Sequence, residues 1–508
     1  MSKHVPARPQ PTHYLSGDGN PVRAPKRSVS QSRRILRVLL VLSGLGAILA
    51  GAAVAAALLV VDRTPREWAP YVVKRAYGHR HFIEDTGSLI AWWLRTADQM
   101  EPAEPFSLPA SLGASDQRSD PVPDGRIVPV SSMPELLTAI TSAQPGDVIQ
   151  LAPGKYVYQN DYAIHIKQPG TAARPITVRA ARLGDATIES GAVVTFNVEA
   201  PFWRFENLVM YGACGSPGDC EHAFHIVGGA SDLVIRNNRL GDYNAMIKIN
   251  GEGGKWPDRG LIEGNSLIDT FARDTQHPIT PIDMVGASHW IIRDNIIADF
   301  ARSYPGGATY GAFAKGAGEG TVFERNLVIC EWKLRHVLSP QVGLSLGGGG
   351  TGVAYSRDKG HTNFEQIGGI VRDNLIVSCN DDGIYVNASA RSLIEHNTLL
   401  DTAGIDVRFV QSSAKVTGNL VDGVVRARDG GMLGAWNNTT PFLLDLFVGW
   451  HPERGYFTNP AVLDLSWRSQ PPRTEADDPN QLDFCGQPEG TQPRIGAFND
   501  YAACLGGR

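Results

Sequence analysis

A short pattern recurs along the middle of this chain, and it constrains the fold more than any other feature. Each copy has two or three β-forming residues, one or two polar residues, an asparagine and then further apolar residues. Clear copies occupy 234–240, 261–267, 291–297, 322–327, 370–375, 393–399 and 416–420, and an earlier one occupies 206–208. The asparagines of the pattern are Asn207, Asn238, Asn265, Asn295, Asn326, Asn374, Asn397 and Asn419.

The spacing between these asparagines varies, with steps of 31, 27, 30, 31, 48, 23 and 22 residues. Repeats of packed helices tolerate less variation, whereas a coil of short strands lets its turns grow while the strands stay in register. A β-propeller blade needs about 40–45 residues, which the two shortest steps rule out locally. Asparagine at a bend can adopt the left-handed conformation, and stacked asparagines can hydrogen-bond from coil to coil. The repeat therefore predicts an all-β solenoid, a parallel β-helix, in which the asparagines hold the fold and carry no chemistry.

The N-terminal region combines a basic arm with an uncharged apolar segment. Residues 1–37 carry a net charge of +7, and because the whole chain carries -5, the remainder carries -12. The segment 38–61 has 24 residues without a charge, enough to cross a bilayer with some tilt. A cleavable signal peptide is the alternative, since 53–55 resembles a cleavage site, but its apolar core is usually about 7–15 residues long. We therefore expect an uncleaved anchor in the inner cell membrane, with the N-terminus in the cytoplasm and the rest in the periplasm or outside the cell.

Composition shifts along the chain predict five regions. We expect 1–34 to be a disordered cytoplasmic arm, 35–62 a transmembrane signal-anchor helix, 63–125 a juxtamembrane segment and linker, 126–445 the β-helix, and 446–508 a C-terminal tail packed on it. In the juxtamembrane segment, Trp68, Trp92 and Trp93 are expected near the bilayer surface. Ser132 and Glu135 have capping-box spacing before an apolar face, which predicts a short helix covering the open end of the solenoid.

Six cysteines fit an oxidising compartment. Cys214 and Cys220 bracket a short loop and are expected to form a local disulfide. Cys485 and Cys504 are expected to form a disulfide that holds the C-terminal tail together. Cys330 and Cys379 follow similar strand patterns, and we expect them to stack inside the body as free thiols. Since none has zinc-ligand spacing with histidines, a metal–cysteine site is not expected.

Several segments carry a resemblance to known proteins. The repeat resembles the right-handed parallel β-helix proteins of the pectate lyase type. The opening, at 134–137, 145–156 and 170–178, looks like that of the chondroitinase B and alginate lyase family, polysaccharide lyase family six. The end, at 483–486 and 494–498, is similar to a tail found on many secreted β-helix proteins. Together these resemblances cover roughly residues 127–500, and they imply a right-handed coil.

The family resemblance also implies a lysine base, an arginine on the next coil and an acidic calcium site beside them. Segment 312–316 looks like the strand that carries the family's lysine, which places Lys315 at that position. Where the arginine is expected, the chain has the glycine run that contains Gly347 and Gly348, and no Glu-x-Glu motif precedes Lys315. Calcium is therefore implied by the resemblance alone, and the residues themselves call for no cofactor.

Chemistry on a uronate needs a base of tuned pKa, a positive group for the carboxylate and an acid for the leaving oxygen. On a solenoid these groups come from neighbouring coils and point out of one strand stack. We predict His225, Lys248, Asp283 and Lys315 as catalytic candidates, with His222 nearby, and Tyr385, Arg408, Gly347 and Gly348 as substrate-binding candidates. A solvated lysine, a surface ion row and packed histidines are the competing interpretations. The insertion 353–369 beside Lys315 is a candidate lid or cleft wall.

Two functions follow from these expectations, and both have a polysaccharide as partner. The first is an enzyme that acts on an acidic polysaccharide by β-elimination or a related step, with Lys315 as base. The second is a non-catalytic glycan-binding or envelope scaffold protein. The lysine and the insertion favour the enzyme. The acidic body argues against nucleic-acid binding, which needs a positive footprint, so no nucleic-acid partner is expected.

Overall fold

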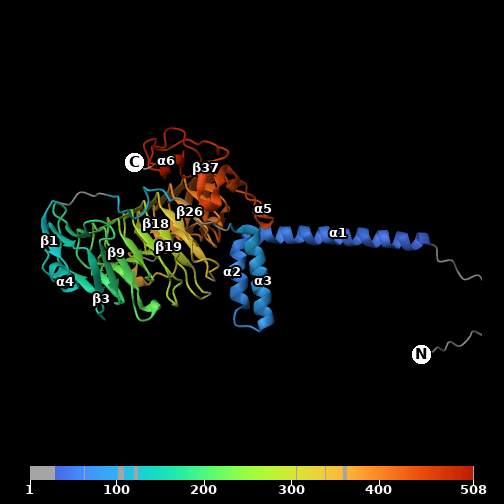
Figure 1. Ribbon diagram of the computed structural model, residues 1–508. Helices are drawn as coiled ribbons and strands as arrows, with labels where there is room; N and C mark the ends of the chain where they lie inside the picture. Colours follow the sequence, from blue (N-terminus) through green and yellow to red (C-terminus); the bar gives the residue numbers. More distant parts are fainter. Residues whose placement is uncertain are drawn as a thin grey trace, which may run out of the picture. The chain divides into compact units, whose positions relative to one another are not determined.

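Figure 1 shows the computed structural model, which describes residues 29–61, 63–100, 108–118, 124–304, 306–337, 339–358 and 363–506. The chain divides into two units, Met1–Val60 and Val61–Arg508. Helix α1 (Val29–Val61) includes all the described residues of the first unit. Its stretch Leu36–Ala53 has a mean hydropathy of 2.0 and is unburied, so it is long and apolar enough to cross a membrane.

The second unit is built on three long parallel sheets, to which successive coils each contribute one strand (Figure 1). Sheet A contains β1 (Arg126–Val130), β2 (Asp147–Leu151), β5 (Ile176–Ala180), β8 (Trp203–Glu206), β11 (Val234–Arg236), β14 (Leu261–Glu263), β17 (Ile291–Arg293), β21 (Val322–Glu324), β25 (Ile370–Arg372), β29 (Ser392–Glu395), β32 (Ser413–Thr417) and β35 (Met432–Trp436). Sheet B contains β3 (Gly154–Tyr158), β6 (Ala186–Ser190), β9 (Val209–Gly212), β12 (Arg239–Gly241), β15 (Ser266–Ile268), β18 (Ile296–Ala298), β22 (Leu327–Ile329), β26 (Leu375–Val377), β30 (Thr398–Leu400) and β33 (Leu420–Val421).

Sheet C carries the predicted functional residues. It contains β4 (Ile164–Ile166), β7 (Val194–Val198), β10 (His222–Val227), β13 (Ile247–Asn250), β16 (Ile282–Val285), β19 (Thr309–Lys315), β23 (Gln341–Gly347), β27 (Ile384–Asn387), β31 (Gly404–Arg408) and β34 (Val424–Arg428). A small fourth sheet joins β20 (Gly318–Glu319), β24 (Gln366–Ile367) and β28 (Ser389–Ala390). The predicted parallel β-helix is therefore confirmed.

Alternation along the strands fills the interior of the coil with apolar side chains. In β10, Phe224 and Ile226 are fully buried, and Phe224 stacks on Phe196 of the preceding coil with ring centroids 5.5 Å apart. Phe205 of sheet A packs in the same layer of the interior, with its ring centroid 4.8 Å from that of Phe224. Because side chains in a strand alternate between faces, the residues between these positions point out of the coil.

The asparagine ladder forms at the bend between sheets A and B. The amide oxygen of Asn265 accepts hydrogen bonds from the backbone N and the side-chain Nδ2 of Asn238, at 2.9 and 3.0 Å. Its own Nδ2 donates to the carbonyl of Ile235 at 2.9 Å and to the next asparagine, Asn295, at 3.0 Å. The same bonds continue through Asn326, so each buried amide is satisfied by the coil on either side.

Three details of the ladder differ from the expectation. The left-handed residue is the one before each ladder asparagine, such as Asp294 with φ 55° or Gly264 with φ 63°. Asn207 takes this left-handed position, with φ 60°, and Leu208 occupies the ladder position, where its backbone N donates to Asn238. The ladder also extends one coil further, because Asn438 accepts from Asn419 at 2.9 Å.

Helices close both ends of the coil. At the start, α4 (Met133–Thr141) is capped by Ser132, whose hydroxyl accepts from the backbone N of Glu135 at 3.4 Å, and it packs on β1 and β2 as predicted. Near the other end, α2 (Pro65–Ala76) and α3 (His81–Asp98) form an antiparallel hairpin. α5 (Leu443–Phe447) contacts α3.

Buried ion pairs fasten this hairpin to the last coils. Arg66 Nη2 lies 2.9 Å from Asp98 Oδ1 and 2.8 Å from Asp401 Oδ1. Glu67 Oε1 lies 2.7 Å from Arg426 Nη2 on β34. All five side chains are almost completely buried, so their charges must be compensated by one another. The contacts hold the hairpin in a fixed position on the solenoid.

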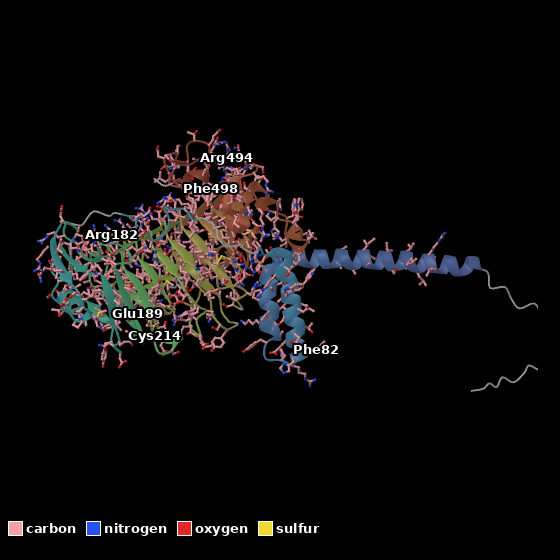
Figure 2. The ribbon with its side chains drawn as sticks, viewed as in Figure 1. Phe82, Arg182, Glu189, Cys214, Arg494 and Phe498 are labelled. Atoms are coloured by element: carbon pink, nitrogen blue, oxygen red, sulfur yellow. A yellow bond between two sulfur atoms is a disulfide. The ribbon has the colours of Figure 1, made fainter. Side chains whose placement is uncertain are left out.

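The C-terminal tail covers the outer face of sheet B. It includes β36 (Phe457–Asn459), β37 (Asp464–Trp467) and α6 (Ala502–Leu505). Phe498, labelled in Figure 2 together with Arg494, packs among Phe457 and Phe484 against the outward leucines of the sheet. This apolar layer replaces solvent over the later strands of sheet B.

Three disulfides join all six cysteines. Cys214 is bonded to Cys220, and Cys485 to Cys504. The expectation of free thiols at Cys330 and Cys379 is wrong, because these two residues are bonded to each other. They follow β22 and β26 on adjacent coils, and their Cα atoms lie 4.9 Å apart, within the range that a disulfide spans.

The ladder makes a stability prediction at Asn326. Replacing Asn326 with Ala removes the acceptor for the backbone N of Asn295 and the donor to the carbonyl of Ile292, and both of these backbone groups stay buried. We expect the free energy of unfolding, measured by chemical denaturation, to fall by about 2–5 kcal/mol. Asn480→Ala, at an exposed turn, is the matched control and should change it by less than about 0.5 kcal/mol. Equal stability of the two variants would contradict a structural role for the ladder.

Candidate functional site

A continuous row of outward-facing side chains crosses sheet C. Register pairing places one residue from each of eight successive strands, from β10 to β34, next to one another. Neighbouring positions are about 4.8 Å apart, the usual spacing of paired strands. The row consists of His225, Lys248, Asp283, Phe313, Ser345, Tyr385, Asp406 and Arg426.

Lys248 and Asp283 form an ion pair within this row. Lys248 Nζ lies 2.8 Å from Asp283 Oδ2, and both side chains are largely shielded from solvent, with 20% and 16% exposed. The other carboxylate oxygen, Oδ1, is buried and accepts no hydrogen bond from the described residues. An unsatisfied buried oxygen of this kind costs free energy.

Lys315 ends β19, two residues beyond the row position held by Phe313. Its Nζ lies 4.7 Å from the centre of the Phe313 ring, and it has no ion-pair partner within 4.0 Å among the described residues. Burial lowers the pKa of Lys315; Lys248 lowers it further, whereas Asp283 and Glu365 oppose the shift. Lys315 thus has the environment of an amine that loses its proton more readily than a solvated lysine.

Two histidines occupy the start of the row. The rings of His222 and His225 are 5.2 Å apart, and His225 Nε2 lies 2.7 Å from Asn250 Oδ1. Burial lowers the pKa of His222 to about 4, and burial followed by nearby Lys248 lowers that of His225, against the hydrogen bond to Asn250. Both imidazoles are therefore neutral at pH 7.

Gly347 and Gly348 lie beside Lys315. Gly347 ends β23 with φ 83°, and a Cβ at this position would lie 1.9 Å from the carbonyl oxygen of Asn387. A Cβ on Gly348 would be 3.6 Å from Cδ of Lys315, so this glycine leaves the lysine stem uncovered. In the resembled family an arginine is expected here, and the absence of any side chain opens the surface instead.

Tyr385 and Arg408 lie further along the sheet. Tyr385 belongs to the row, and Arg408 ends β31, one coil later. Burial raises the pKa of Tyr385 to about 12, and the adjacent guanidinium of Arg408 partly opposes this rise. Arg408 Nε lies 2.5 Å from Asp429 Oδ2, so its charge already has a partner. Three strand spacings, about 14 Å, separate Arg408 from Lys315 along the sheet, too far for both to touch one sugar.

The described part of the insertion lies against the strand ends beside Lys315. The backbone N of Arg357 donates to Gly316 at 3.0 Å, and the backbone N of Gly316 donates to the carboxylate of Glu365 at 2.9 Å. Thr351 donates to the same carboxylate at 2.6 Å. The insertion therefore forms one side of the surface around Lys315.

The donor set around Lys315 does not fit the calcium site implied by the resemblance. Among the described residues, the carboxylates near Lys315 are Asp283, bound to Lys248, and Glu365, which accepts from Gly316 and Thr351. Calcium needs six to eight oxygen ligands, usually with several carboxylates. Two engaged carboxylates do not provide that set, and no step of the chemistry below uses the ion.

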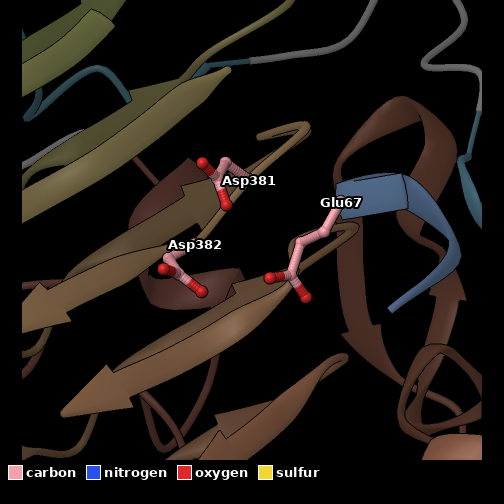
Figure 3. Close-up of side chains that lie close together, drawn as sticks. All are labelled: Glu67, Asp381 and Asp382. Carbon is pink, nitrogen blue, oxygen red and sulfur yellow. The ribbon is translucent and has the colours of Figure 1, made fainter. Parts of the chain in front are cut away.

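Elsewhere in the described residues, one group of carboxylates has metal-ligand spacing. Glu67, Asp381 and Asp382 offer oxygens within 4.8 Å of one another (Figure 3). Arg426 already neutralises this group, because its Nη2 lies 2.7 Å from Glu67 and 3.3 Å from Asp382. The cluster is thus part of the attachment of the hairpin.

Sequence reasoning missed Phe313 and Asn250. Phe313 shields Lys315 from water although it points out of the coil, and it is 4% exposed. The alternation Ala312-Phe313-Ala314-Lys315 contained this signal, because residues two apart share a face of a strand. Asn250 is two residues after Lys248 and shares its face by the same rule.

Comparison with known proteins confirms the resemblance at the opening of the coil. The family model described as Chondroitinase B matches residues 130–204. This match covers a minor part of the chain, so it supports the resemblance and does not establish membership. No curated protein matches the chain in sequence.

Solved structures agree on the fold. Pectate lyase Pel9A aligns with a TM-score of 0.51 and 12% identity, over 77% of this chain and 100% of its own. An alginate lyase from Paenibacillus sp. str. FPU-7 aligns at 18% identity over 62% of this chain and 95% of its own, but its TM-score of 0.35 supports no argument. At these identities the first likeness shows the β-helix fold alone, because one fold hosts many functions.

The electrostatics make a prediction about Lys315. Asp283 holds the pKa of Lys315 up and Lys248 pushes it down, so Asp283→Asn should lower the pKa of Lys315 further. The pKa can be followed by NMR titration of the chain after reductive ¹³C-methylation of its lysines. Asp429→Asn, a carboxylate beside Arg408, is the matched control and should leave this titration unchanged. A raised or unaltered pKa in Asp283→Asn would show that Asp283 and Lys315 do not interact as described.

Proposed function

We propose that this protein is a membrane-anchored, extracytoplasmic enzyme that cleaves an acidic polysaccharide by β-elimination. The observation that carries the proposal is the state of Lys315. It is an amine on the outward face of a lyase-type β-helix, shielded by Phe313, with a lowered pKa and no ion-pair partner among the described residues. Proton abstraction beside a carboxylate requires a base that can be unprotonated, and a lowered pKa favours the neutral amine.

In the proposed reaction, neutral Lys315 removes the proton from the carbon next to the uronate carboxylate. The electron pair of that C–H bond forms a double bond to the neighbouring ring carbon. The bond from that carbon to the glycosidic oxygen breaks, and the oxygen leaves with the electron pair. It takes a proton from the Lys315 ammonium, directly or through a water molecule, so the base is regenerated and the cleavage consumes neither an oxidant nor water.

The neighbouring groups on sheet C have positioning roles in this proposal. Lys248, paired with Asp283 at 2.8 Å, supplies positive charge toward the substrate carboxylate. His225 is neutral and presents one ring nitrogen to the surface after bonding Asn250 with the other. Arg408 and Tyr385 lie far enough away to contact a different sugar of the same chain.

The location follows from three features that support one another. Three disulfides in one chain favour an oxidising compartment. α1 is apolar enough to anchor the chain, and the basic residues before it favour a cytoplasmic N-terminus. The body then lies in the periplasm or outside the cell, where acidic polysaccharides are accessible.

A non-catalytic glycan-binding role is the second candidate, and two observations favour it. The charges at Lys248 and Arg408 already have carboxylate partners at 2.8 and 2.5 Å. Gly347 and Gly348 stand where the resembled family implies an arginine. In this case the partly exposed end of the row, at His225, Lys248 and Asp283, would hold a polysaccharide without cleaving it.

The decisive experiment is a lyase assay on the full chain. The protein is incubated with a panel of uronate polysaccharides, with and without calcium, and the ultraviolet absorbance of unsaturated products is followed. Lys315→Ala removes the base and should reduce the rate about 100- to 10,000-fold. Lys415→Ala, an exposed lysine on β32 of sheet A, is the matched control and should retain the rate.

The wild-type rate should also rise with pH as Lys315 loses its proton, because only the neutral amine accepts one. Absence of product from folded wild-type protein on every substrate would refute the lyase. Retained polysaccharide binding in that protein would then establish the glycan-binding role.

Arg408 makes a separate prediction. If its guanidinium holds a carboxylate of a distant sugar, Arg408→Ala should raise KM several-fold and leave kcat nearly unchanged, the pattern of lost uniform binding. Arg182→Ala, at an exposed turn, should alter neither constant. An unchanged KM in Arg408→Ala would show that this arginine does not bind substrate and only pairs with Asp429.

A further inference from the structure

The hairpin of α2 and α3 exposes an apolar surface that the fold does not use. Gly87, Ala91 and Leu94 face inward from α3 and pack against α2 and its neighbours. On another face of α3, Phe82, Leu89 and Trp93 are 80%, 64% and 58% exposed. Five large apolar residues share this exposed face: Phe82, Ile83, Leu89, Ile90 and Trp93.

Helix geometry makes these residues one continuous stripe. Phe82, Leu89 and Trp93 are separated by seven and four residues, so they lie nearly above one another at 3.6 residues per turn. Ile83 and Ile90 flank the stripe at a spacing of seven. A contiguous apolar face of this kind on a soluble body marks a contact surface, because leaving it in water is unfavourable.

The segment around α5 adds further exposed apolar residues next to the end of α3. Phe442, Val448 and Trp450 are 82%, 79% and 60% exposed. A Cβ on Gly449 would lie 3.1 Å from the carbonyl oxygen of Ala97, so this segment is adjacent to the last turn of α3. We call these residues and the stripe on α3 the hairpin face.

The tip of the hairpin is basic. Lys74, Arg75 and Arg80 are exposed there, together with His79 and His81. Figure 2 labels Phe82 at this tip. Two carboxylates, Glu84 and Asp85, follow, and Glu84 is engaged in accepting a hydrogen bond from the backbone N of Gly78 at 2.8 Å. Aromatic residues beside clustered Lys and Arg are suited to the interface of an anionic membrane.

The chain itself restricts how far this surface can be from a membrane. Three residues separate the end of α1 at Val61 from the start of α2 at Pro65. Even fully extended, this connection spans at most about 14 Å. α2 is fixed to the solenoid by the buried pairs of Arg66 and Glu67, so the hairpin cannot swing away independently.

We propose that the hairpin face lies in the headgroup region of the membrane that α1 enters, with the basic tip bound to anionic lipid headgroups. The aromatic and aliphatic side chains enter the interface, and Lys74, Arg75 and Arg80 contact phosphate groups. The contact orients the solenoid at the membrane and goes beyond the proposed cleavage of polysaccharide, because it requires no catalysis.

Tryptophan fluorescence tests this contact in the full chain. The protein is reconstituted into vesicles of phosphatidylcholine and phosphatidylglycerol that carry brominated acyl chains, which quench nearby tryptophans. α1 contains no tryptophan, so quenching reports on the body. Trp93→Phe and Trp450→Phe should each remove a large part of the quenching, whereas Trp256→Phe, in the middle of the solenoid, should remove none.

Charge provides the second arm of the test. Combined replacement of Lys74, Arg75 and Arg80 with glutamate should reduce the quenching of wild-type tryptophans when phosphatidylglycerol is present, and high salt should do the same. Unchanged quenching in a folded charge variant would refute the role of anionic headgroups.

Unchanged quenching in Trp93→Phe, with thermal unfolding like that of wild type, would overturn the proposal. In that case crosslinking of the chain to a second copy through the hairpin face would identify the alternative occupant. A lyase assay on the same variants keeps the two proposals separate, because loss of the membrane contact leaves Lys315 intact.

Discussion

The asparagine ladder and the parallel hydrogen bonds around it are the constraint on which the rest of the structure depends. Each buried amide is satisfied only when the same residue type stands one coil above and below it, as with Asn265 between Asn238 and Asn295. A slip of one residue would turn every side chain of a strand to the other face. Fixed register is therefore what brings Lys248 and Asp283, from separate coils, into one ion pair.

The same register places lysines in different electrostatic environments. Lys248 faces a carboxylate at 2.8 Å, so its charge is compensated where it is partly buried. Lys315, two coils later, has the ring of Phe313 beside its amine, and burial lowers its pKa. Desolvation disfavours the charged form unless an opposite charge repays it. This contrast between two lysines of one sheet is why the proposal assigns proton transfer to Lys315.

Much of this fold can be predicted from the sequence, because each coil repeats the same short pattern of residues. The alternation and the recurring asparagine predicted the ladder. However, Asn207 lies one residue before the ladder position, and the sequence analysis did not include Asn438 in the ladder. Strand position also predicted that the candidates would share sheet C. The sequence contains no pattern that predicts contacts between distant segments, because these contacts depend on the path of the intervening turns. Examples are the contacts of Asp429 with Arg408, Cys330 with Cys379, and Arg66 with Asp401.

The outward row of sheet C ends on the hairpin itself. Asp406 is followed by Arg426, which binds Glu67 of α2 at 2.7 Å. Four strand spacings, about 19 Å, separate the strand of Lys315 from that of Arg426. The sheet fixes this distance, and a buried ion pair clamps the hairpin to the strand of Arg426. If the hairpin rests on the membrane, Lys315 works at a set height above it, and the coil axis keeps a set direction. A flexible tether would hold the solenoid at the membrane but would fix neither the height nor the direction.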